Sequence, residues 1–115
     1  MIKSFIVACE WGYNMRLSEK QRESIVAVIK ECFGGSASVL LFGSRTKDDA
    51  KGGDIDLLIT TDMTDVGAIV RAEVRCQVLL EQTLGNQKID LLIDYPTRRQ
   101  RPPVMLAAHA QGQAI

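Results

Sequence analysis

The chain has 115 residues, of which 46% are apolar, with 14 basic and 14 acidic side chains. This length suits one domain, and the composition excludes a disordered or collagen-like chain. The net charge of zero excludes a global basic field that would hold nucleic acid. Residues 48–65 nevertheless carry six acidic side chains and one basic one, a local surplus that indicates either a solvated loop or a cation site.

The N-terminal part of the chain carries few structural signals. We expect residues 1–16 to form an arm in front of a single domain that spans residues 17–115. No apolar run approaches the ~18 residues of a membrane span, so we expect no membrane partner. The three cysteines are too few and too scattered for a disulfide framework or a zinc site, which favours a reduced, cytoplasmic protein. They are Cys9, Cys32 and Cys76.

The first predicted elements are a helix over 19–33 and a strand over 38–42. Ser18 and Gln21 form a capping-box pattern at the start of this helix, where each side chain satisfies an open backbone donor. Apolar residues then recur at helical spacing, and Gly34-Gly35 ends the helix. The strand is a short apolar run between glycines, which is typical of a buried strand.

The remaining pattern predicts a strand, a helix capped by Thr64 or Asp65, a third strand, a basic link and a short final helix. The two strands are predicted at 54–60 and 88–93, the link at 98–103 and the final helix at about 104–112. Gly85-Asn86 ends the helix between the strands. Proline fits the first turn of a helix, so Pro102-Pro103 can open the last one. This order indicates an α/β or α+β domain with a small sheet of mixed strand direction.

Three aspartates stand in apolar strands. Side chains alternate along a strand, so Asp54 and Asp56 point the same way, about 7 Å apart. Two such carboxylates repel each other unless a cation lies between them, and Mg²⁺ favours carboxylate oxygens. The sequence Ile-Asp-Leu-Leu-Ile occurs at 55–59 and again at 89–93. Asp90 would therefore supply a third carboxylate if its strand lies beside 54–60, and three carboxylates could hold two metal ions.

A glycine and a serine directly follow the first predicted strand. At Gly43 the absence of a side chain lets backbone N–H groups approach an anion, and the Ser44 hydroxyl adds a donor. Arg45 and Lys47 could add charge-assisted contacts to phosphates. The alternatives are that Ser44 caps a helix and that Arg45 makes a surface ion pair.

These motifs together resemble a known family. The run Leu41-Phe42-Gly43-Ser44-Arg45, followed after a nine-residue spacer (45–53) by Asp54-Ile55-Asp56-Leu57, is similar to the signature of the minimal nucleotidyltransferases, or MNT domains, of the polymerase-β superfamily. The resemblance covers about residues 17–94. It implies a nucleotidyltransferase fold, with a small mixed sheet backed by helices.

The resemblance also implies the roles of five residues. Gly43 and Ser44 would bind the nucleoside triphosphate, and the charge of Arg45 beside them adds it to the nucleotide-binding candidates. Two Mg²⁺ ions would be bound by three carboxylates, those of Asp54, Asp56 and Asp90. The spacer is short, and Thr46 stands where the family often has alanine. Asp94 is a neighbouring alternative to Asp90.

Members of this family transfer a nucleoside monophosphate from an NTP to a hydroxyl and release pyrophosphate. Many small prokaryotic members are similar to antitoxins that are encoded beside a helical HEPN-type partner and can adenylylate its tyrosine. The resemblance therefore implies ATP or another NTP as the substrate and a partner tyrosine as the acceptor. No acceptor-binding domain is expected here, which favours a protein acceptor.

Two other functions stay open from the sequence. The protein could neutralise a helical partner by occlusion without catalysis, or it could modify a small molecule with the help of a separate subunit. A homo-oligomer also stays open. The remaining polar and sulfur residues have ordinary interpretations: Arg98, Arg99 and Arg101 form a solvated link, His109 is structural or exposed, and Cys32 and Cys76 belong to the core.

Overall fold

The computed structural model describes residues 17–42, 54–85 and 88–115. The predictions for the arm over 1–16 and for Gly43, Ser44 and Arg45 lie outside these ranges. The helices and strands are, in chain order, α2 (Glu19–Phe33), β1 (Ser38–Phe42), β2 (Asp54–Thr60), α3 (Val66–Leu84), β3 (Lys88–Asp94), α4 (Pro103–Gln111) and β4 (Gln113–Ala114).

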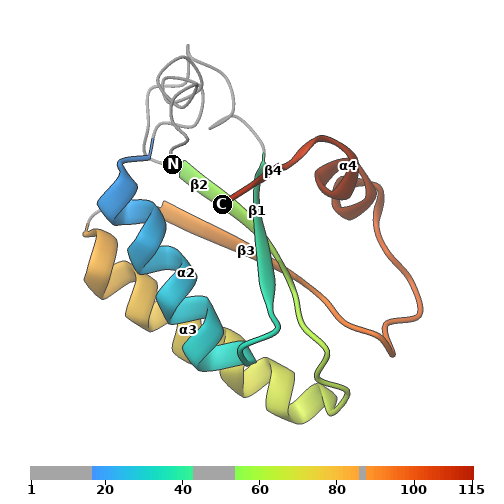
Figure 1. Cartoon of the computed structure of the whole chain (residues 1–115). Helices are drawn as coiled ribbons and strands as arrows, with labels where there is room; N and C mark the ends of the chain where they lie inside the picture. The colour runs from blue at the N-terminus through green and yellow to red at the C-terminus, as the bar shows by residue number, and fades with distance from the viewer. Residues whose placement is uncertain (1–16, 43–53, 86–87) are drawn as a thin grey trace.

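The strands form one four-stranded sheet in the order β3-β2-β1-β4. β2 pairs with β1 in the antiparallel direction and with β3 in the parallel direction. The predicted mixed sheet of an α/β fold is therefore confirmed. A parallel pair needs a crossover connection, and α3 supplies it between β2 and β3 (Figure 1).

Helices α2 and α3 cover one face of the sheet, while α4 lies on the other (Figure 1). The main core fills the space under α2 and α3. The buried residues of this core include Ile25, Ile29, Phe33, Leu41, Ile55, Leu57, Ile59, Ile69, Cys76 and Leu80. A smaller cluster under α4 is formed by Leu58, Met105 and Ala108, with Leu40, Phe42 and Leu92 packed against it.

The helix ends follow the capping residues seen in the sequence. The Ser18 hydroxyl accepts a hydrogen bond from the backbone N–H of Gln21, and the Gln21 side chain accepts one from the N–H of Ser18, each at 3.0 Å. Of the two candidates for the second helix, Asp65 is the cap, and it accepts a bond from Ala68 N–H at 3.0 Å. This helix stops at Gly85, whose φ of 83° suits glycine.

The C-terminal part differs in detail from the prediction. The last helix covers Pro103–Gln111 rather than 104–112, and the two-residue strand β4 that follows was not predicted. β4 pairs with Leu40 and Leu41 of β1. Gly112 joins α4 to β4 where a Cβ would lie 2.6 Å from the Ala108 carbonyl oxygen and 2.9 Å from Leu40 Cβ. Only glycine fits this close approach.

The two described cysteines lie in the helical layer, as expected for core residues. Cys76 is fully buried and Cys32 is half-buried. Burial, together with the neighbouring Cys32, raises the pKa of the Cys76 thiol to about 12. A thiol that stays protonated at neutral pH is a poor nucleophile, so Cys76 contributes packing rather than reactivity.

Candidate active site

The repeated sequence Ile-Asp-Leu-Leu-Ile lies on two adjacent strands in exact phase. In the parallel β2–β3 pair, Ile55 is opposite Ile89, Asp56 opposite Asp90, and each following residue opposite its counterpart. Adjacent strands lie about 4.8 Å apart. The structure thus brings Asp56 and Asp90 together, which is the condition under which the sequence predicted a third carboxylate.

Both carboxylates belong to the sheet face on which α4 lies. Asp56 precedes Leu58 by two residues, and Asp90 precedes Leu92 by two, so strand alternation places each pair on one face. Leu58 and Leu92 pack in the cluster under α4. Asp56 is partly exposed and Asp90 is exposed. We call this surface the carboxylate face.

The end of β1 also reaches this point. Phe42 is the antiparallel partner of Asp56, so one row across the sheet runs from Phe42 through Asp56 to Asp90. Gly43 directly follows Phe42 in the sequence, which means that the chain leaves β1 beside the two carboxylates. Asp54 begins β2 and pairs with Lys88, and its side chain lies outside the described part of the structure.

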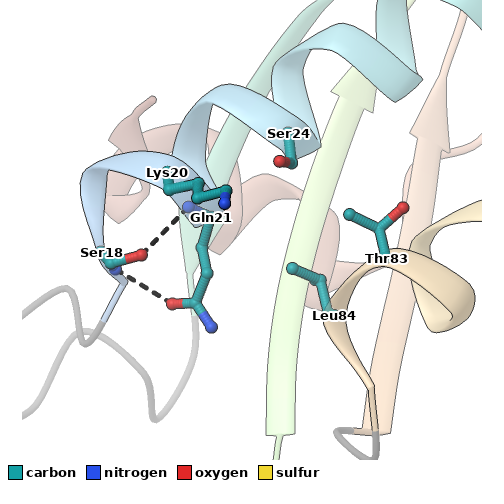
Figure 2. Close-up of a pocket in the computed structure, with 6 residues that line it drawn as sticks. All are labelled: Ser18, Lys20, Gln21, Ser24, Thr83 and Leu84. Atoms are coloured by element: carbon teal, nitrogen blue, oxygen red, sulfur yellow. Dashed lines mark hydrogen bonds between the residues drawn. The ribbon is translucent and has the colours of Figure 1, made fainter.

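A pocket of about 330 Å³ lies between the start of α2 and the end of α3 (Figure 2). Its lining includes Ser18, Gln21 and Thr83. Because α2 and α3 cover the face opposite α4, this pocket opens on the other side of the sheet from Asp56 and Asp90. It does not form part of the carboxylate face.

Comparison with known proteins agrees with this geometry. A family model described as a nucleotidyltransferase domain matches residues 22–108, which is most of the chain. The chain belongs to the nucleotidyltransferase domain family. This match supports the polymerase-β superfamily, whereas a search of curated proteins found no match. None of the described helices is long and apolar enough to cross a lipid bilayer.

In this nucleotidyltransferase domain, the carboxylate face offers the donor chemistry that a divalent metal ion needs. Asp56 and Asp90 provide hard oxygen ligands on neighbouring strands, which suits Mg²⁺. Among the described residues, no group of three or more acidic, histidine or cysteine side chains comes together as a metal site. The described pair therefore fits part of the predicted ligand set, and Asp54 is the third member that the sequence assigns.

Asp94, the sequence alternative to Asp90, is occupied by other side chains. Its carboxylate oxygens each accept a hydrogen bond from Arg101 Nε at 2.9 Å, and His109 Nε2 lies 2.7 Å from one of them. An ionised carboxylate only accepts hydrogen bonds, so His109 Nε2 donates. Tyr95 N–H donates a further bond at 2.9 Å. Asp94 therefore anchors the link and α4 to the sheet.

This cluster corrects one prediction and refines another. Arg98 and Arg101 were expected in a solvated link. Arg101 instead forms an ion pair with the buried Asp94, and Arg98 is half-buried with its guanidinium 5.6 Å from the centre of the Tyr95 ring. His109 was expected to be structural or exposed, and it is both, since it holds α4 to β3 with its side chain 37% accessible. Asp94 follows Asp90 by four residues, so both side chains lie on the same face of β3. This spacing was the one feature of the sequence that indicated where Asp94 lies.

The surroundings of Asp94 give the protein an acid-sensitive contact. Burial alone would raise the pKa of Asp94, but the hydrogen bonds from Arg101 and His109, the charge of Arg101 and the Tyr95 N–H together hold that pKa below its ordinary value. An aspartate in the unfolded chain has a pKa of about 3.9. Its stabilising effect is therefore complete above that value and is lost as the pH falls through the lower native pKa.

We expect the Asp94→Asn variant to be less stable than the wild type at pH 5, with the difference shrinking towards pH 3. Urea unfolding of both proteins at several pH values in this range measures it. The neutral amide of asparagine makes weaker hydrogen bonds with Arg101 than the ionised carboxylate does. The carboxylate stabilises the wild type more than the amide only while it is ionised, so the difference in stability shrinks as Asp94 is protonated. A difference in unfolding free energy that is constant between pH 5 and pH 3 would contradict this account.

Proposed function

We propose that this nucleotidyltransferase transfers AMP from Mg-ATP to a hydroxyl group of a partner protein. The observation that carries the proposal is the in-phase pairing of Asp56 with Asp90 beside the end of β1. In the reaction, the acceptor oxygen bonds to the α-phosphorus, the bond from that phosphorus to the β-phosphate bridging oxygen breaks, and pyrophosphate leaves. The hydroxyl proton passes to a carboxylate or to water.

Each predicted site residue has a part in this scheme. Asp54, Asp56 and Asp90 would hold Mg²⁺, which supplies neutralisation of the phosphate charge. Gly43 and Ser44 would grip the β- and γ-phosphates through backbone N–H groups and a hydroxyl, and Arg45 would add a cationic contact. Asp90 is exposed and can accept the acceptor's proton. Positioning and charge neutralisation provide most of the catalysis in phosphoryl transfer.

For the acceptor, we propose a tyrosine of a helical HEPN-type partner, so that the protein acts as an antitoxin. This assignment rests on the motif resemblance. The exposed apolar side chains of α4 are consistent with it. Val104 and Leu106 are each more than half exposed, while Met105 between them packs on the carboxylate face. A partner that contacts these two side chains would lie on the same face of the sheet as Asp56 and Asp90.

The test uses the full chain, Mg²⁺ and the product of the adjacent gene, with ATP labelled at either the α- or the γ-phosphate. We expect the partner to acquire the α-label only, and mass spectrometry to place an AMP group on a tyrosine. Labelling from γ-labelled ATP alone would mean kinase activity and overturn the proposal. A stable complex without any label would replace it by neutralisation through occlusion.

A further inference from the structure

The outer surface of α3 carries a row of exposed apolar side chains. Val66, Val70, Val74 and Val78 are 47–61% exposed. Their spacing of four residues makes them neighbours in one row, which turns about 40° around the helix at each step. At its start, Val66 and Val70 also line a hollow against β3. We call this row the valine stripe. Valine is a poorer helix former than alanine or leucine, so neither helix propensity nor solvation explains four valines at surface positions. Such a contiguous patch is typical of a contact surface.

The other described surfaces of the helical layer do not share this feature. On the outer side of α2, the exposed positions are charged or small, for example Glu23, Ala27 and Lys30. The free edge of β3 is partly covered, because Gln77 Nε2 donates to the Ile89 carbonyl oxygen at 2.8 Å and Arg98 Nη1 donates to that of Ile93 at 3.4 Å. The valine stripe is therefore the strongest apolar surface of this layer.

Charged residues flank the stripe in two rows of opposite sign. Helical geometry places Arg71 and Arg75 along one side and Glu73 and Glu81 along the other. Arg75 already contacts Glu31 of α2 at 2.9 Å. Along α3 itself the face is therefore basic, apolar and acidic across its width, and it can complement itself. Beyond the acidic side, Arg98 lines a hollow together with Val66, Val70 and Glu73.

We propose that the valine stripe is a dimer interface that packs against the same stripe of a second copy, with the two α3 helices parallel. A two-fold axis along the helices then lays the basic row of one copy on the acidic row of the other. Residues rise about 1.5 Å each along a helix, so Glu73 stands midway in height between Arg71 and Arg75. Each Glu73 would therefore meet Arg71 of the second copy, while Arg75 keeps its contact with Glu31 of its own α2.

The same charges disfavour the antiparallel arrangement. A two-fold axis across the helices brings like rows together, so Arg71 of one copy would meet Arg71 and Arg75 of the other. Side chains spaced by four residues favour two helices that cross and contact each other around one point. The charged residues lie beside Val70 and Val74, so this point falls at the middle of the stripe. With a net charge of zero, two copies do not repel each other at long range.

Sedimentation velocity of the full chain across micromolar concentrations tests the interface. A single helix pair covers less than a standard interface, so we expect a concentration-dependent monomer–dimer equilibrium. Val74→Lys should make the protein monomeric, while the matched control Ala27→Lys on α2 should leave the equilibrium unchanged. A wild type that is monomeric at every concentration would overturn the proposal. This holds even if Val74→Lys weakened the binding of a different protein, because the stripe would then be an interface with that protein and not with a second copy.

Charge exchange tests the orientation. Arg71→Glu and Glu73→Arg should each weaken self-association about tenfold or more, and an equimolar mixture should recover heterodimers. In an antiparallel dimer, Arg71→Glu would instead strengthen association by removing the arginine–arginine contact. Strengthening, or failure of the mixture to recover, would overturn the parallel arrangement. Circular dichroism of each variant confirms that it is folded, and the readout does not depend on the transferase activity.

Discussion

Replacing Asp90 by asparagine is expected to reduce AMP transfer at least ~100-fold while leaving the fold intact. Loss of a residue that merely orients a metal ligand typically costs 10- to 100-fold, and Asp90 is assigned to the ligand set itself. Asparagine keeps the shape of the side chain but removes the negative charge that attracts Mg²⁺. Since Asp90 is exposed, the substitution creates no cavity. The initial rate of label transfer from α-labelled ATP measures the effect.

Asp62→Asn is the matched control for this experiment. Asp62 is exposed and lies beyond the opposite end of β2, where its carboxylate accepts a hydrogen bond from Ser36 at 2.9 Å. We expect this variant to keep the wild-type rate. Mg²⁺ should raise the melting temperature of the wild type and of Asp62→Asn, because a ligand of the native state stabilises it. An Asp90→Asn variant with full activity would remove Asp90 from the proposed site.

The sequence predicted the relation between Asp56 and Asp90 because the two strands repeat one pattern. Both strands are apolar apart from an aspartate in the same frame, and a shift of one residue would turn every side chain to the wrong face. Pairing them in phase is therefore the arrangement that buries Ile55 with Ile89 and keeps both carboxylates on one surface. The strand order itself could not be read from one sequence, so the predicted role of Asp90 depended on its strand lying beside β2.

The position of α4 could not be predicted in the same way. Its nine residues include several alanines that give no clear apolar face, and its contact with β3 depends on Asp94 and His109, which are 15 residues apart. Nothing in their spacing indicates a hydrogen bond. The strand β4 has only two residues, too few for any alternation. For Gly43, Ser44 and Arg45, the sequence remains the basis of the predicted role.

Truncation of one central side chain is expected to remove a large part of the stability. Leu57 is fully buried in the main core, in the strand that lies between β1 and β3. Leu57→Ala leaves a cavity that neighbouring strands and helices cannot close freely, and such changes cost about 2–5 kcal/mol. A domain of this size has roughly 5–15 kcal/mol in total. Urea unfolding measures the change in free energy.

Leu106→Ala is the control, because it makes the same chemical change at a side chain that is 55% exposed. Surface substitutions usually change stability by less than about 0.5 kcal/mol, so the two variants should differ several-fold in their effect. Leu57 also follows Asp56 directly, and loosening β2 would disturb the alignment of Asp56 with Asp90. Leu57→Ala should therefore lose transfer activity at a lower temperature than the wild type does. Equal destabilisation by both variants would contradict the central position of β2.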